Sequence, residues 1–336
     1  MGINLLYDNL RMKAQLFLFL TLCMPNIVCA DASQRRTSVN NTPQIQNKQG
    51  DTLHAEGYYQ QAERYRTGVN CQQDFDKAYR LYKQAADLNY TPAIHALAMC
   101  HLQGIGTPCN PPEFLRLIEI SARKGYGKSI SCLLAAHNGD TPYFPKNKEK
   151  YEEWFKYGAN LRIPEFMYEY GGYLLNSQVN ETIRNEDIIN EGLSWITLAA
   201  NQGLPQAQNE LGRLALYGIW RDVDGEEAIK WLTLAAEQGL AVSQRHMGIC
   251  YTLGIGVEQN FETAFMWFTK AANGGDAYAQ MCLALAYYNG EGTEQNLTEA
   301  YKWAHKSAAQ GREDAKALLQ KINCNIASPD TESLNK

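Results

Sequence analysis

One short stretch of the sequence has residue types that could do covalent chemistry. Ser121-Ala-Arg-Lys124 places a lysine three residues after a serine, which is the spacing of the nucleophile box in enzymes that recognise penicillins. The two further boxes of those enzymes, S-D-N and K-T-G, do not follow it. This motif alone therefore offers a β-lactam or cell-wall amide hydrolase as an alternative function, and no other motif in the chain supports it.

The cysteines suggest a second kind of chemistry. Seven of the nine follow residue 30 and could pair in an oxidising compartment. The candidate pairs are Cys100–Cys132 and Cys250–Cys282, which share a separation of 32 residues, and Cys71–Cys109, with Cys324 left over. The alternative is that cysteine serves at these positions as a small apolar core residue.

The remaining histidines and glycines do not form a metal or cofactor site. The six histidines are scattered and lack the H-E-x-x-H spacing of zinc enzymes, and no C-x-x-C occurs. The glycine pairs at 104/106, 254/256 and 290/292 lack the third glycine and the preceding strand of a dinucleotide-binding loop. We therefore expect no cofactor and no bound metal, and we interpret these glycines as turns.

A nine-residue pattern that recurs through the chain must position all of these residues. Its clearest copy is WLTLAAEQG at 231–239, with near-copies at 195–203, 267–275 and 303–311. When seven copies are aligned on their pair of small residues, the intervals are 36, 37, 41, 36, 36 and 36 residues. A regular period of this size is typical of a solenoid of stacked repeats. Ser121 falls in the small-residue column, where packing alone explains a serine.

Each copy contains two helical patterns. In the second, called helix B, Ala228, Trp231 and Ala235 are spaced as on one face of a helix. In the first, helix A, a glycine or alanine at 212, 248 or 284 leaves room on the core face, so we expect a tryptophan such as Trp231 or Trp267 to pack against its backbone. Each copy is thus predicted to be a helical hairpin that buries its apolar face only by stacking on its neighbours.

These columns resemble the Sel1-like repeat, a relative of the tetratricopeptide repeat. The resemblance is strong over 192–319, good over 58–125 and degraded between 138 and 190. It implies an all-α fold, a right-handed α/α superhelical solenoid of about seven 36-residue hairpins with a concave face. Members of this family mostly serve as interaction scaffolds. Some cysteine-rich secreted members bind or hydrolyse β-lactams, although their cysteines are placed differently.

The sequence also predicts the cellular location of the protein and the division of the chain into segments. Residues 12–30 have Lys13, a short apolar run and small residues before Asp31, which is typical of a secretory signal peptide. The apolar run is shorter than the ~20 residues of a spanning helix, so we expect an exported protein, periplasmic or secreted, without a transmembrane segment after cleavage. The predicted segments are a signal peptide (1–30), a disordered lead (31–52), Sel1-like repeats (53–137), degenerate repeats with an insertion (138–191), Sel1-like repeats (192–311), a capping helix (312–324) and a tail (325–336).

Charge and repeat pattern together favour a binding scaffold. The net charge of −5 gives no general attraction for nucleic acid or anionic lipid. We expect a non-catalytic scaffold that binds a protein or peptide partner, or a cell-wall fragment, on its concave face; a peptidoglycan-binding regulator is a further alternative. The candidate binding residues lie on helix A outside the core columns: His95, Met99, Asn209, Arg213, Arg245, Ile249, Tyr278, Met281, Leu285 and Tyr288.

Overall fold

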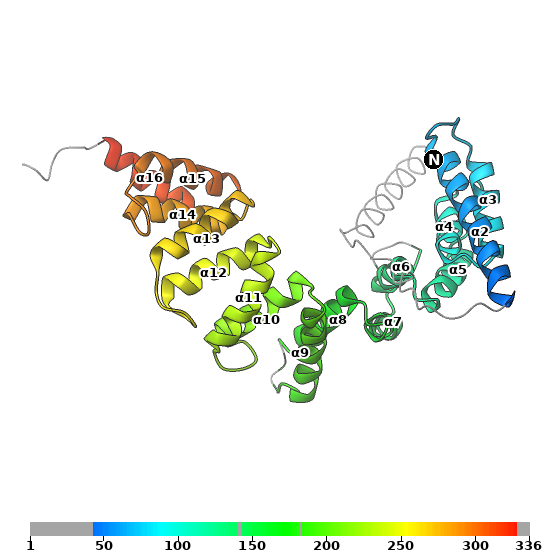
Figure 1. Ribbon diagram of the computed structural model, residues 1–336, viewed down its shortest axis with the longest axis horizontal. Coiled ribbons are helices and arrows are strands. Elements are labelled where there is room, and N and C mark those ends of the chain that lie inside the picture. The colour runs from blue at the N-terminus through cyan, green and yellow to red at the C-terminus, as the bar shows by residue number, and fades with distance from the viewer. Residues whose placement is uncertain (1–42, 140–142, 180, 182, 328–336) are drawn as a thin grey trace, which may run out of the picture. The chain divides into compact units, whose positions relative to one another are not determined.

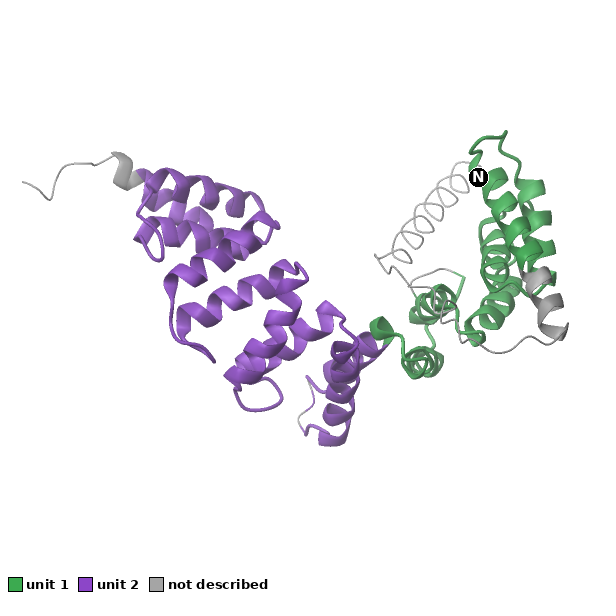
Figure 2. Cartoon of the chain, viewed as in Figure 1, with its two compact units in different colours: residues 1–166 green, residues 167–336 purple. Residues whose placement is uncertain are grey.

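The computed structural model describes residues 43–139, 143–179, 181 and 183–327. Over these residues it is all-helical and divides into two compact units, Met1–Phe166 and Met167–Lys336 (Figure 2). The helices of the first unit are α2 (Pro43–Thr67), α3 (Phe75–Asp87), α4 (Thr91–Gln103), α5 (Pro111–Arg123), α6 (Gly127–Asn138) and α7 (Lys148–Asn160), followed by the start of α8 (Pro164–Ser177). Those of the second are the rest of α8, α9 (Glu186–Asn201), α10 (Pro205–Tyr217), α11 (Gly225–Glu237), α12 (Ala241–Leu253), α13 (Phe261–Asn273), α14 (Ala277–Asn289), α15 (Leu297–Ala309) and α16 (Glu313–Ala327) (Figure 1).

Consecutive helices pair as hairpins, as the repeat predicts. The even-numbered helices from α2 to α14 are the helices A, each followed by its helix B, and α16 packs after the last hairpin. Helix A ends at a left-handed glycine in the regular copies, for example Gly254 with φ 69°, a conformation that glycine adopts without a steric penalty. Helix B begins at an asparagine or aspartate, such as Asn260, whose side-chain oxygen accepts a hydrogen bond from the Thr263 N–H. The predicted all-α array of hairpins is confirmed.

The contact between helix A and helix B differs from the sequence prediction in one respect. A Cβ added to Gly248 would lie 2.5 Å from a ring carbon of Phe268, and one added to Gly212 would lie 2.6 Å from Leu232. The bulky residue against the glycine is therefore the one after the tryptophan, and the expectation for Trp231 and Trp267 was wrong. One residue is about 100° of rotation on a helix, which moves the tryptophan to a neighbouring contact. Trp267 packs against the buried cluster that contains Leu232.

Glutamines join neighbouring hairpins at regular positions. The Gln238 side-chain amide donates to the Gly203 carbonyl at 3.1 Å and to Gln208 Oε1 at 2.8 Å. The same two bonds recur two hairpins later, where Gln310 donates to the Gly275 carbonyl at 3.2 Å and to Gln280 Oε1 at 2.9 Å. These bonds satisfy carbonyl groups at the end of one helix B from the next, so they fix the stacking of successive hairpins.

The helices also move two predicted segment boundaries. Helix α2 begins at Pro43, so residues 43–52 are helical rather than part of a disordered lead; proline is favoured at the first helical position. Helix α16 continues to Ala327, beyond the predicted end of the capping helix at 324. The predicted signal peptide at 1–30, the rest of the lead and residues 328–336 lie outside the described residues.

The close contact at Gly248 can be tested by adding a single methyl group. Gly248→Ala is expected to lower the free energy of unfolding by about 1–3 kcal/mol, because the methyl group overlaps the Phe268 ring. The matched control is Gly172→Ala, within helix α8, where nothing lies within 4 Å of an added Cβ. There, alanine should be neutral or stabilising by up to about 1 kcal/mol. Urea unfolding followed by circular dichroism measures both, and equal losses would contradict the packing described.

Candidate functional site

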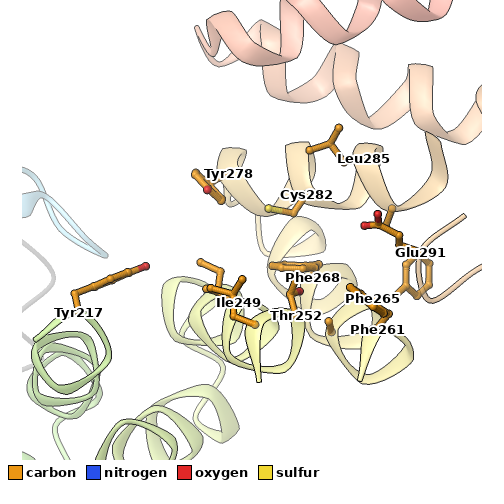
Figure 3. Close-up of a pocket in the computed structure, with 13 residues that line it drawn as sticks. Tyr217, Ile249, Thr252, Phe261, Phe265, Phe268, Tyr278, Cys282, Leu285 and Glu291 are labelled. Carbon is orange, nitrogen blue, oxygen red and sulfur yellow. The ribbon is translucent and has the colours of Figure 1, made fainter. Parts of the chain in front are cut away.

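An open apolar groove lies between α12 and α14, with α13 as its floor. It has a volume of about 380 Å³. Figure 3 shows Ile249 on α12 and Leu285 on α14, with Phe268 of α13 between them. The cavity belongs wholly to the second unit, and we call it the α12–α14 groove. Its lining residues are Tyr217, Ile249, Thr252, Leu253, Phe261, Ala264, Phe265, Phe268, Tyr278, Cys282, Leu285, Ala286 and Glu291.

The groove exists because two positions change between consecutive helices A. Between α10 and α12, the ring of Tyr217 lies edge-on to His246 with centroids 5.9 Å apart. Asn209 Oδ1 accepts a hydrogen bond from the Ser243 hydroxyl and also contacts the His246 ring nitrogen at 3.2 Å. One period later, Leu253 and Cys282 stand where Tyr217 and His246 stood. These side chains are smaller and carry no comparable polar network, so the space between α12 and α14 stays open.

Large apolar side chains are exposed along this groove. Leu253 is 62% exposed. The exposed fraction is also above one third for Tyr217, Phe261, Tyr278 and Leu285. Scattered exposed apolar residues are normal on a soluble protein, but several around one concavity are the usual mark of a binding site. The exposed apolar lining makes this groove the best candidate site in the described part of the chain.

Three of the predicted binding residues, Ile249, Tyr278 and Leu285, line the groove together. Met281 does not, and its expected exposure was wrong. It is 8% exposed and belongs to the buried cluster that also contains Leu318 and Ile322 of α16. The structure thus brings part of the predicted set into one site.

Polar interactions hold most of the remaining predicted residues. Arg213 donates two hydrogen bonds to Glu210, at 3.0 and 2.7 Å. Arg245 Nε donates to Asp276 at 3.1 Å, and its guanidinium lies 5.2 Å from the centre of the Tyr278 ring. The others are Asn209, which bonds Ser243; His95, which bonds Ser129; Met99, which is half-buried on α4; and Tyr288, which packs against the core cluster of α13 to α16.

Sequence reasoning missed the α13 side of the groove and its acidic end. Phe261 and Phe265 come from helix B, which was expected to serve only the core, and Glu291 from the turn after α14. A signal was present in the sequence. One period before and after Phe261 stand Gly225 and Leu297, so a phenylalanine here departs from its neighbouring repeats.

The serine of the S-x-x-K motif is buried. Ser121 has no exposed surface, accepts a hydrogen bond from the Ser129 hydroxyl at 2.8 Å and donates to the Thr91 carbonyl at 3.4 Å. Ser307, in the same column, donates to the Ala277 carbonyl at 2.7 Å. Lys124 is exposed at the end of α5. Ser121 therefore has the packing role of its column and is closed to a substrate.

None of the three candidate disulfides is formed in the structure. Cys71, Cys100, Cys109, Cys250 and Cys282 are free thiols, and each candidate pair contains at least one of them. Burial raises the pKa of Cys100 and of Cys250 to about 12, which suits the alternative that cysteine is a small core residue here. The thiols of the exposed turns, Cys71 and Cys109, donate instead to carbonyl oxygens of Arg64 and Leu102.

Among the described residues no group of three or more His, Cys, Asp or Glu side chains is arranged to hold a metal ion. Nor does any helix there have the length and apolar content to cross a membrane. The features of the groove that bear on its function are therefore its apolar lining and the few charged residues near it.

The profile of one protein family matches most of the chain. The profile of the Sel1 repeat matches residues 53–90, 91–126, 164–204, 205–240, 241–276 and 277–311. The unmatched residues 127–163 include all of α6 and α7, which keep their helices although the repeat profile does not match them. No curated protein matches the chain.

Two solved structures have a similar fold. The protective antigen c5321 of uropathogenic Escherichia coli, which displays an SLR fold, aligns with a TM-score of 0.64 at 21% identity over 82% of this chain. This chain covers 58% of the length of that protein. A Sel1 repeat protein from Oxalobacter formigenes aligns with a TM-score of 0.64 at 23% identity over 93% of this chain and 86% of its own. At these identities the likeness shows the fold alone.

The histidine beside the groove predicts a loss of stability in acid. Burial, with smaller effects from Arg245 and Arg213, lowers the pKa of His246 to about 4. The unfolded chain, with a histidine pKa of about 6.5, then binds more protons than the folded one between pH 6.5 and 4. Stability is expected to fall by about 2 kcal/mol over this window for this residue, and His246→Gln should remove that part of the slope.

Urea unfolding at several pH values between 4 and 7 measures the slope. His305→Gln, at an exposed position of α15, is the control. His95, whose pKa burial also lowers to about 4, keeps a slope in both variants. A slope that His246→Gln leaves unchanged would contradict the prediction.

Proposed function

The chain belongs to the Sel1 repeat family, and on this basis we propose that it is a non-catalytic, exported scaffold that binds a segment of a partner protein in the α12–α14 groove. Sel1 repeat proteins generally mediate protein–protein interactions. What the repeat alone leaves open is the surface used, and the proposal rests on one observation for that. The exposed apolar side chains of α10, α12, α13 and α14 gather around a single concavity.

The lining of the groove favours a protein segment over a cell-wall fragment. A saccharide needs many hydrogen-bonding groups to replace its hydration, and the groove offers few. The Thr252 hydroxyl already donates to the Gly248 carbonyl at 2.8 Å, and burial raises the pKa of the Cys282 thiol to about 12, so it stays neutral. Apolar side chains of a peptide have no hydrogen bonds to water to replace, so their transfer from water into the groove is favourable. The same lining speaks against a peptidoglycan-binding regulator.

The buried S-x-x-K serine supports the non-catalytic part of the proposal. A nucleophile must reach its substrate and lie beside a base, whereas Ser121 is enclosed by Ser129 and the start of α4. An amide hydrolase would need a different nucleophile.

Export is supported by the sequence of residues 12–30, which has the charge, the short apolar run and the cleavage-site pattern of a signal peptide. If the chain is exported, N-terminal sequencing of protein recovered from outside the cytoplasm should begin at Asp31. Recovery only from the cytoplasm, with residues 12–30 retained, would contradict export and leave the groove proposal unaffected.

Two charges introduced into the groove should abolish partner binding. Leu253→Glu combined with Leu285→Glu is expected to weaken binding at least about tenfold, since each carboxylate would enter an apolar contact. The fold should survive, because both side chains are exposed in the free protein. Leu234→Glu, at a comparably exposed position of α11, is the matched control.

The measurement is affinity capture from an extract of the source cells, followed by a binding isotherm with the purified captured protein. A partner retained by the unaltered chain and the Leu234 control but lost with the double variant supports the proposal. A partner that binds all three equally would place the interaction elsewhere on the scaffold.

A further inference from the structure

The charged residues around the groove indicate the chemistry of the segment that it binds. Among the residues that line it, only Glu291 is charged. It lies in the turn after α14, at the opposite end of that helix from Tyr278 (Figure 3). Its carboxylate is exposed and accepts one hydrogen bond, from the Asn289 amide at 3.2 Å. No ion pair to this carboxylate occurs among the described residues.

A second depression adjoins the groove at this end and carries the same sign of charge. It has a volume of about 910 Å³ and shares Phe261 and Phe265 with the groove. Its charged residues are Glu262 and Glu294, both exposed and both without an ion-pair partner in the described part of the chain. The two depressions that share Phe261 and Phe265 are therefore lined by three carboxylates without ion pairs, those of Glu262, Glu291 and Glu294.

The other end of the groove is charge-balanced. Arg245 and Arg312 lie 5.2 and 4.4 Å from the centre of the Tyr278 ring. Each is already paired with a carboxylate, Arg245 with Asp276 and Arg312 with Asp314. An incoming anion would meet these carboxylates, so this end offers no net charge to a partner.

The helix ends at this side add little net charge. Helices α12 and α14 end where Leu253 and Glu291 lie, whereas α13 begins there at Phe261, and the two kinds of helix end carry partial charges of opposite sign. The phenylalanine faces add to the preference of the carboxylates for a cation, because a cation is attracted to the electron-rich face of an aromatic ring.

From this charge complementarity we propose that the segment bound in the α12–α14 groove carries a large apolar side chain and, a few residues away, a lysine or arginine. The inference rests on the proposed function, since it concerns the same groove. The apolar side chain packs between Ile249, Phe268 and Leu285, and the cation reaches the carboxylates of Glu262, Glu291 and Glu294 over the two phenylalanine rings. The 13 residues of α14 span about 20 Å, which an extended peptide covers with about six residues.

The test is a set of synthetic peptides of about eight residues, long enough to cover the groove in extended form. One set carries a single phenylalanine near the amino end and a second set carries it near the carboxyl end. In both, the position of a single variable residue is moved along the rest of an otherwise neutral peptide. That residue is lysine, glutamine or glutamate. Fluorescence polarisation with the purified full chain measures each affinity at low and high salt.

At the best position, the lysine peptide is expected to bind about tenfold more tightly than the glutamine peptide, and the glutamate peptide most weakly. High salt should reduce the difference, because the carboxylates are exposed. The triple variant Glu262→Gln, Glu291→Gln, Glu294→Gln should remove the preference for lysine without weakening the glutamine peptide. Asp222→Asn combined with Glu226→Gln and Glu237→Gln, three exposed positions on α11 and the turn before it, is the charge-matched control and should keep the preference.

The outcomes separate this inference from the proposed function. Equal binding of the three peptides, sensitive to the Leu253 and Leu285 substitutions, would overturn the inference and leave the groove as the binding site. Tighter binding of the glutamate peptide would overturn it as well, and would point to the arginines beside Tyr278. Absence of binding by every peptide, with partner capture unaffected by the groove substitutions, would overturn both.

Discussion

The close approach of helix B to helix A is the contact on which the rest of this structure depends. Gly248 admits the Phe268 ring, and Gly212 admits Leu232, at distances that leave no space even for a methyl group. This contact fixes how each hairpin closes, and a closed hairpin presents its remaining apolar face for stacking. Bonds such as those of Gln238 then join one hairpin to the next. The helix A side of this contact has little freedom to change, because it is held by a glycine or alanine, as at 212, 248 and 284.

Variation is therefore concentrated at positions that lie between successive helices A. The pair Tyr217 and His246 fills that space after α10, whereas Leu253 and Cys282 leave it open after α12. The exchange leaves the contact of Gly248 with Phe268 in place, because neither Leu253 nor Cys282 takes part in it. A repeat scaffold can thus open a binding groove at one hairpin without rebuilding its core. The groove follows from a local departure from the period, while the fold follows from the period itself.

The same distinction explains how much could be predicted from the sequence. The hairpins, their number and their turns follow from residue columns that repeat every 36 residues, and these predictions are confirmed. The contact of Trp231 was wrong because spacing defines a helix face only to within about one residue, and one residue is about 100°. Met281 lies outside the core columns of helix A and is nevertheless buried, in the cluster that also contains Leu318 and Ile322 of α16.

The groove itself could be predicted only in part. Ile249, Tyr278 and Leu285 were recognised as positions outside the core columns, and they do lie together. Whether a cavity opens between them depends on the sizes of side chains from four helices, which no single column contains. The ion pair of Arg245 with Asp276 joins residues 31 positions apart, so the charge balance at that end follows from the stacking and not from either repeat alone.

The first unit shows how the same architecture closes its surface. Tyr82 occupies the column of Phe268, and its hydroxyl donates a hydrogen bond to Glu63 on α2. Glu63 also pairs with Arg66, and the ring of Tyr59 packs 5.8 Å from that of Tyr82. A hydroxyl at this position therefore gathers a carboxylate and a second aromatic ring over the hairpin contact. Phe268 has no such polar tip, and its ring lines the α12–α14 groove.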